Sequence, residues 1–143
     1  MLRELELFFM IRAQWLIDGR FRALSNMHSL PAAFYSNNEV ELASSLSDLD
    51  RIFQDTQDRL LRDGVVRIRP RVIELGDPQK NTFPVLVEFR ALDRYGQILF
   101  LVRIRFYVHG ATSATFRIEM QEEIERKHIA QTPVSPTDTT VVH

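Results

Sequence analysis

The sequence predicts an α+β fold in which helices cover one face of an antiparallel sheet. Two patterns lead to this prediction. Apolar residues recur at helical spacing over much of the first 63 residues, and apolar and polar residues alternate from residue 65 to about residue 124. One apolar and one charged face are typical of an antiparallel sheet covered on one side only. The helices must then lie on the apolar side.

The N-terminal segment is predicted to be helical. Residues 2–18 place an apolar stripe along one side of a helix, formed by Leu2, Leu5, Phe9, Ala13 and Leu16. Gly19 is suited to end this helix because glycine adopts the left-handed conformation of a helix C-cap. A short second helix is predicted at about 21–27.

A hairpin and a longer helix follow. The runs LPAAFY and EVELA flank a Ser-Asn-Asn segment, residues 36–38, and asparagine tolerates the positive φ angles of a tight turn. The next segment, SSLSDLDRIFQDTQDRLLRDG, has a helical apolar period. Ser45 or Ser47 would cap its N-terminus, and Gly64 would end it.

Four strands are predicted at about 65–75, 84–92, 97–109 and 114–124. The predicted inner, apolar face consists of Val66, Ile68, Val85, Val87, Phe89, Ala91, Ile98, Phe100, Val102, Ile104, Phe106, Val108, Phe116, Ile118 and Met120. The predicted outer face consists of Arg67, Arg69, Arg71, Glu88, Arg90, Arg103, Arg105, Tyr107, Arg117, Glu119 and Gln121. Ile68 and Ile73 are out of phase, which predicts a bulge or bend at the intervening Pro70 and a curved sheet.

This order of elements resembles the nuclear-transport-factor-2-like superfamily, which includes ketosteroid-isomerase-like and polyketide-cyclase-like proteins. WLIDGRFRALSNMHSLPAAFY is similar to the helical segment that leads into the first strand of its small bacterial members. SLSDLDRIFQDTQDRL resembles their third helix, and YGQILFLVRIRFYVHG with FRIEMQEE resembles their last hairpin. The resemblance covers about residues 2–124 and implies a single domain at residues 1–125. The Pro/Thr-rich composition of the last stretch predicts an extended tail at 126–143.

The resemblance implies a bent sheet that forms a cone, with the three helices packed on its apolar face and an apolar pocket inside. It also implies frequent dimerisation through the outer face of the sheet. Superfamily members include isomerases, dehydratases, cyclases and hydrolases, but also binding modules and accessory subunits. The fold alone therefore does not choose between catalysis and binding.

The residues point to no conventional catalytic site. The chain has no cysteine, its four histidines lack metal-ligand spacing, and no glycine-rich phosphate loop occurs, so we predict no metal and no cofactor. The predicted inner set of the last strands holds no Asp, Glu, His or Tyr, so no acid–base pair is evident and catalytic residues stay unknown. The candidates for lining a pocket are Trp15, His28, Tyr35, Phe53, Phe89 and Phe106.

The arginine-rich outer face predicts an interface. Its candidate residues are Arg69, Arg90, Leu99, Leu101, Arg103, Arg105, Tyr107 and Arg117. Arginine is enriched at interfaces, and the apolar members would serve as anchors, so we predict a homodimer. The alternative is a solvated face in which Arg–Glu pairs join neighbouring strands. A net charge of −1 and the lack of interleaved stacking aromatics argue against nucleic acid.

The sequence therefore predicts a protein that binds a small apolar ligand and has no evident acid–base site. Two alternatives remain: an isomerase-, cyclase- or dehydratase-like enzyme acting on a small hydrophobic substrate, and a structural or interaction module or accessory subunit. No run of about 18 apolar residues exists to span a membrane. We expect a cytoplasmic protein, and the scarcity of lysine among the 18 basic residues is typical of a GC-rich bacterial genome.

Overall fold

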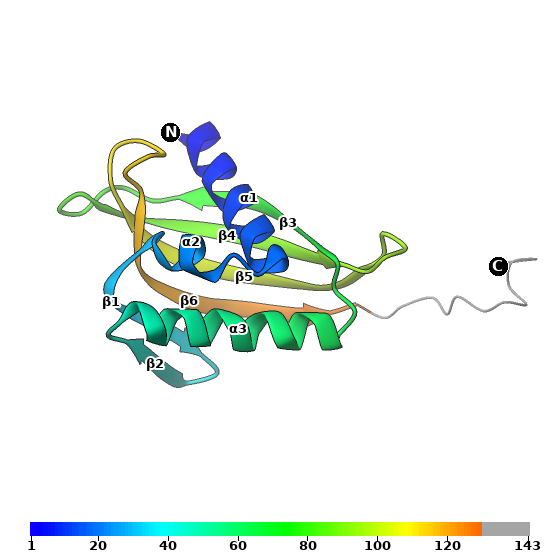
Figure 1. Cartoon of the computed structure of the whole chain (residues 1–143). Coiled ribbons are helices and arrows are strands. Elements are labelled where there is room, and N and C mark those ends of the chain that lie inside the picture. Colours follow the sequence, from blue (N-terminus) through cyan, green and yellow to red (C-terminus); the bar gives the residue numbers. More distant parts are fainter. Residues whose placement is uncertain (130–143) are drawn as a thin grey trace, which may run out of the picture.

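The computed structural model describes residues 1–129 and places three helices on one side of a curved, unclosed six-stranded sheet (Figure 1). The predicted α+β class is confirmed. The elements in chain order are α1 (Leu2–Asp18), α2 (Phe21–Ser25), β1 (His28–Ser36), β2 (Glu39–Ala43), α3 (Leu46–Arg62), β3 (Arg67–Leu75), β4 (Thr82–Leu92), β5 (Ile98–His109) and β6 (Arg117–His128).

The strands lie in the order β2-β1-β6-β5-β4-β3. The predicted hairpin is formed by β1 and β2, and both residues of its turn, Asn37 and Asn38, have positive φ angles of 47° and 64°. β1 pairs with β6 in parallel, whereas all other neighbouring strands are antiparallel. The hairpin thus extends the sheet on the side of β6, next to α3 (Figure 1).

The core lies between the helices and the inner face of the sheet. α1 ends as predicted at Gly19, which adopts the left-handed conformation with a φ of 75°. The Phe9 side chain of α1 is fully buried, and its ring centroid lies 4.6 Å from that of Phe106 on β5. Phe89 on β4 packs against both rings in edge-on geometry. These aromatic contacts fix α1 against the centre of the sheet.

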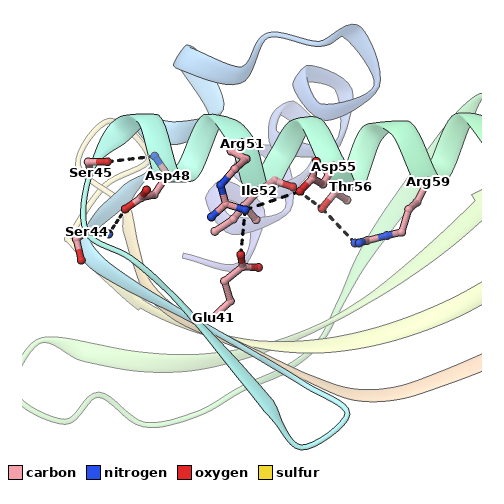
Figure 2. Close-up of polar contacts among 9 residues, drawn as sticks. All are labelled: Glu41, Ser44, Ser45, Asp48, Arg51, Ile52, Asp55, Thr56 and Arg59. Carbon is pink, nitrogen blue, oxygen red and sulfur yellow. Dashed lines mark hydrogen bonds and ion pairs between the residues drawn. The ribbon is translucent and has the colours of Figure 1, made fainter.

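α3 is held at its N-terminus and against β2 by polar contacts (Figure 2). The Ser45 hydroxyl accepts a hydrogen bond from the backbone N–H of Asp48 at 3.1 Å, and the Asp48 carboxylate accepts one from the Ser44 N–H at 2.9 Å. One turn later, Arg51 contacts Glu41 of β2 at 3.2 Å and Asp55 at 3.8 Å. These contacts cap α3 and link its exposed side to β2.

Replacing Ser45 with alanine is expected to lower the free energy of unfolding by about 1 kcal/mol, because the helix loses its N-cap acceptor. Urea denaturation followed by circular dichroism measures the change. Ser44→Ala is the matched control, since Ser44 contacts Asp48 through its backbone and its expected change is within about 0.5 kcal/mol. Equal losses in the two variants would contradict the assignment of Ser45 as the cap.

The sheet bends at bulges that differ from the predicted one. Pro70 lies on the edge strand β3, where a missing N–H is tolerated, and it pairs in register with Phe89 of β4. The register between β3 and β4 shifts instead at Ile73. The predicted bulge position was therefore wrong by three residues, although the predicted change of phase is real. β6 runs to His128, past the predicted strand end at 124. Most of the predicted tail, residues 126–143, lies outside the described residues.

Candidate functional site

A cavity of about 130 Å³ lies between α1, α3 and the inner face of the sheet. Twelve of its sixteen lining residues are apolar, so the cavity favours an apolar occupant. The lining consists of Arg12, Ala13, Leu16, Phe34, Ile52, Phe53, Thr56, Leu60, Ile68, Phe89, Ala91, Phe100, Val102, Ile104, Gln121 and Arg126.

Arg12 of α1 places a buried guanidinium at the cavity wall. The residue is 5% exposed, and its Nη2 donates a hydrogen bond to Gln121 Oε1 at 2.9 Å. Its Cζ lies 5.0 Å from the ring centroid of Phe106 and 5.7 Å from that of Phe53, while Nε has no hydrogen-bond partner in the described part of the chain. Burial lowers the pKa of Arg12 to about 10, so the side chain is still a cation at neutral pH. Among residues 1–129, no carboxylate forms an ion pair with it.

Two bulges in β6 turn polar side chains toward the cavity. The register with β5 shifts at Glu119, so that Gln121 lies opposite the fully buried Phe106 and shares its inner face. A second shift at Ile124 places Arg126 opposite Val102, again on the inner face. The predicted outward placement of Gln121 was wrong because the bulge at Glu119 inserts a residue that reverses the alternation, and the bulge at Ile124 then restores it.

The inner face also carries an ion pair near the cavity. Glu123 lies opposite Ile104 of β5, and its carboxylate contacts the Arg126 guanidinium at 2.9 Å. The Arg126 Cζ lies 4.9 Å from the ring centroid of Phe100. His128 also lies on this side, where its ring contacts that of Phe100. The prediction that the inner face of the last strands holds no acidic residue and no histidine was therefore wrong.

His28 is buried at the start of β1, and within residues 1–129 neither of its ring nitrogens has a hydrogen-bond partner. Its ring centroid lies 5.5 Å from that of Phe34 and 5.3 Å from that of Phe53, two residues that line the cavity. Burial, together with the positive charge of Arg12, holds the pKa of His28 well below its ordinary value. The imidazole is consequently neutral at pH 7.

No protein-family model and no curated protein sequence matches the chain. Solved structures do match it. Aln2 from a Streptomyces species is 11% identical with a TM-score of 0.62, covering 87% of this chain and 88% of its own. A Catenulispora acidiphila protein in complex with S-DNPA is 12% identical with a TM-score of 0.61, covering 99% and 96%. An ntf2-like protein with a cystatin-like fold from Novosphingobium aromaticivorans is 13% identical with a TM-score of 0.61, covering 85% and 79%.

The chain has the nuclear-transport-factor-2-like fold. Within this cone, the predicted pocket residues lie in different places. Phe53 and Phe89 line the cavity, and the buried ring of Phe106 packs against the guanidinium of Arg12. Trp15 instead lines a separate groove between α1, the α2 region and the 113–117 segment, while Tyr35 is 39% exposed on β1. The cavity therefore brings together only part of the predicted set.

Most of the predicted interface residues lie on the outer face of this nuclear-transport-factor-2-like sheet. Arg103 and Arg90 flank Glu88, which is buried and contacts their guanidinium groups at 3.2 Å and 3.7 Å. Leu99, by contrast, packs against the core at a shift of register between β4 and β5. Arg117 turns back on its own segment, where it donates to the Phe116 carbonyl at 2.7 Å.

Arg12 was missed by the sequence prediction, although the sequence contains a signal for it. In a helix, residue 12 falls three positions after Phe9 and four before Leu16, inside the apolar stripe. A charged residue within a buried stripe is an exception to amphipathic patterning and makes the position a candidate for a functional role. Gln121 had no comparable signal, because its orientation depends on a bulge that the alternation pattern does not reveal, and Arg126 lies past the predicted strand end at residue 124.

The part of the chain that the structure describes contains no helix long and apolar enough to cross a lipid bilayer. Residues 1–129 also contain no group of three or more His, Cys, Asp or Glu side chains arranged to hold a metal ion. The polar groups at the cavity are thus donors and ion pairs rather than a metal-ligand cluster.

Proposed function

We propose that the chain binds a small, largely apolar molecule in the cavity between α1, α3 and the sheet. The observation that carries this proposal is the lining, in which apolar side chains from both helices and several strands surround one space. A structural relative, the Catenulispora acidiphila protein, was solved in complex with S-DNPA, which supports the capacity of this fold to hold a small ligand.

The volume sets the size of the ligand. The cavity measures about 130 Å³, and an engineered apolar cavity of about 150 Å³ in another protein binds benzene. The enclosed part of a ligand is therefore about one six-membered ring in size. Larger molecules would have to extend past Arg126, whose side chain is 41% exposed.

Toluene is expected to raise the melting temperature of the unmutated chain by a few degrees. At ten times the Kd, a ligand that binds only the folded state adds about 1.4 kcal/mol to the free energy of unfolding. Ala91→Leu fills the cavity from β4 and is expected to abolish the shift, whereas Ala111→Leu, at an exposed turn position, is expected to retain it. Differential scanning calorimetry makes the measurement. No shift in the unmutated chain, or an equal shift in Ala91→Leu, would contradict ligand binding.

An enzyme of the isomerase, cyclase or dehydratase type is the second candidate function, and His28 is the observation that favours it. A buried imidazole whose ring nitrogens have no hydrogen-bond partner within residues 1–129 can act as a general base. Its strongly lowered pKa makes it a weak base, and it lies behind Phe34 and Phe53 rather than in the lining itself. Binding without acid–base chemistry is therefore the better-supported function.

We also propose that two copies of the chain associate through the outer face of β3–β6. This face carries arginines together with glutamates, including the Arg105–Glu122 pair at 3.8 Å, so it presents both charges to a second copy related by a two-fold axis. Such a face also serves the third candidate function, an interaction module or accessory subunit.

Arg105→Glu and Leu101→Asp are each expected to lower the mass in solution from that of a dimer to that of a single chain. Both place a negative charge in the middle of the proposed interface, where it must be desolvated on association. Multi-angle light scattering measures the mass, and Arg51→Glu on exposed α3 is the matched control. A single-chain mass for the unmutated protein would rule the dimer out.

A further inference from the structure

The charge of Arg12 has no counter-charge among the residues that the structure describes. Isolated charges are costly to bury, and buried cations in proteins are normally paired with a carboxylate. Arg12 has only one side-chain hydrogen bond within residues 1–129, to a neutral amide oxygen, and aromatic ring faces supply the rest of its surroundings. Its Nε remains without a partner. Buried polar groups normally have hydrogen-bond partners, so the Arg12 guanidinium lacks an acceptor that residues 1–129 do not provide.

The other polar groups of the cavity are donors or are already occupied. Because Arg12 can only donate, the oxygen of the Gln121 amide must face it, which leaves the Gln121 NH₂ group as a donor without a hydrogen-bond partner among residues 1–129. The Thr56 hydroxyl donates to the Ile52 carbonyl at 2.9 Å and lies 3.5 Å from Nη2 of Arg59 (Figure 2). The cavity thus offers N–H groups to an occupant and lacks a matching free acceptor.

The second arginine of the cavity differs from the first. Arg126 forms two hydrogen bonds with Glu123, at 2.9 Å and 3.3 Å, so its charge is neutralised within β6. His28 contributes no charge, because it is neutral at pH 7. The cavity therefore holds one uncompensated positive charge, and that charge belongs to Arg12.

We propose that the ligand of the cavity is a small apolar carboxylic acid, whose carboxylate pairs with Arg12 while its ring or chain packs between Phe53, Phe89 and Val102. This inference rests on the proposed ligand-binding function and adds the chemical class of the ligand. A single unpaired guanidinium matches a monoanion, and its planar fork matches the two oxygens of a carboxylate. The Gln121 NH₂ group supplies a further donor to the same anion. Benzoate, one ring with one carboxylate, fits both the size and the charge.

The test compares benzoate with its neutral isostere benzamide at pH 7, using ligand-observed NMR to measure the two Kd values. Benzoate is expected to bind about ten- to a hundredfold more tightly, since hydrogen bonds to a charged group are the stronger ones. Arg12→Met is expected to remove this preference, while toluene binding persists. Arg12→Lys supplies an ammonium group without the planar fork and should keep only part of the preference, and Arg51→Met, which removes an exposed arginine of α3, should leave it unchanged.

The outcomes separate the two proposals. Toluene binding without a preference for benzoate overturns the carboxylate inference and leaves the proposed function standing. A preference that survives in Arg12→Met overturns it as well, because the anion would then be held elsewhere. If neither toluene nor benzoate binds the unmutated chain, the proposed function itself is contradicted. Toluene binding in Arg12→Met shows that this variant retains the folded cavity, and Arg12→Lys provides an independent reading of the charge.

Discussion

Replacing Arg12 with methionine and Gln121 with leucine together is expected to raise the free energy of unfolding in the absence of ligand by about 1–4 kcal/mol. Buried ionic groups are often less stable than apolar side chains of similar volume, because desolvation of the charge outweighs the contacts it gains. Methionine retains the packing of the arginine stem, and leucine at position 121 avoids an orphaned amide oxygen. A protein that keeps a costly charge at this place does so at the expense of its own stability, as binding sites commonly do.

Urea denaturation of the paired variant and of Arg51→Met measures this expectation. Arg51 is exposed and pairs with Glu41 and Asp55, so its replacement is expected to change the free energy of unfolding by no more than about 1 kcal/mol. A loss of more than about 1 kcal/mol in the paired variant would show that the Arg12–Gln121 hydrogen bond and the contacts with Phe53 and Phe106 serve the fold. The charge would then need no ligand to explain it.

The stability of the unmutated chain is expected to fall as the pH drops below about 6.5, because of His28. The unfolded chain takes up a proton on this residue near the ordinary histidine pKa of about 6.5, whereas the folded chain resists protonation to a much lower pH. Within that window the unfolded state binds more protons, so His28 lowers the free energy of unfolding by up to about 1.4 kcal/mol for each pH unit. Above pH 7 this contribution is constant.

His28→Phe isolates this contribution from that of other groups. The variant retains an aromatic ring between Phe34 and Phe53 but cannot be protonated, so its free energy of unfolding should change less steeply between pH 6.5 and 5. His128→Phe, at an exposed position near the end of β6, is the matched control and should keep the slope of the unmutated chain. Parallel slopes for the unmutated chain and His28→Phe would contradict the burial of a neutral imidazole.

The fold could be predicted because its signals are local and repeated. The apolar stripe of α1, the Gly19 cap and the Asn37-Asn38 turn each depend on a few neighbouring residues, and the structure confirms them. The alternation in β4 and β5 identified the inner face correctly over most of its length, because those strands pair across long stretches of regular register. When such local preferences agree with the overall fold, the fold can be predicted from the sequence.

The candidate site could be predicted only in its apolar part. Phe53 and Phe89 follow from periodicity, but Gln121 reaches the cavity through a bulge in β6 that depends on pairing with β5, and Arg126 lies past the predicted end of that strand. Arg12 was overlooked among apolar neighbours, although its place in the stripe was visible. The consequence was large, because without these residues the inner face was predicted to lack chemistry, whereas the structure places a buried cation there.

A crystal structure of the unmutated chain with benzoate tests the central claim most directly. It should show the ring inside the cavity, between Phe53, Phe89 and Val102, and a carboxylate oxygen about 2.7–2.9 Å from the guanidinium of Arg12. A ring in the cavity with its carboxylate turned away from Arg12 would contradict the claim. Benzoate bound only at the outer arginines of the sheet, with the cavity unoccupied by it, would contradict it equally.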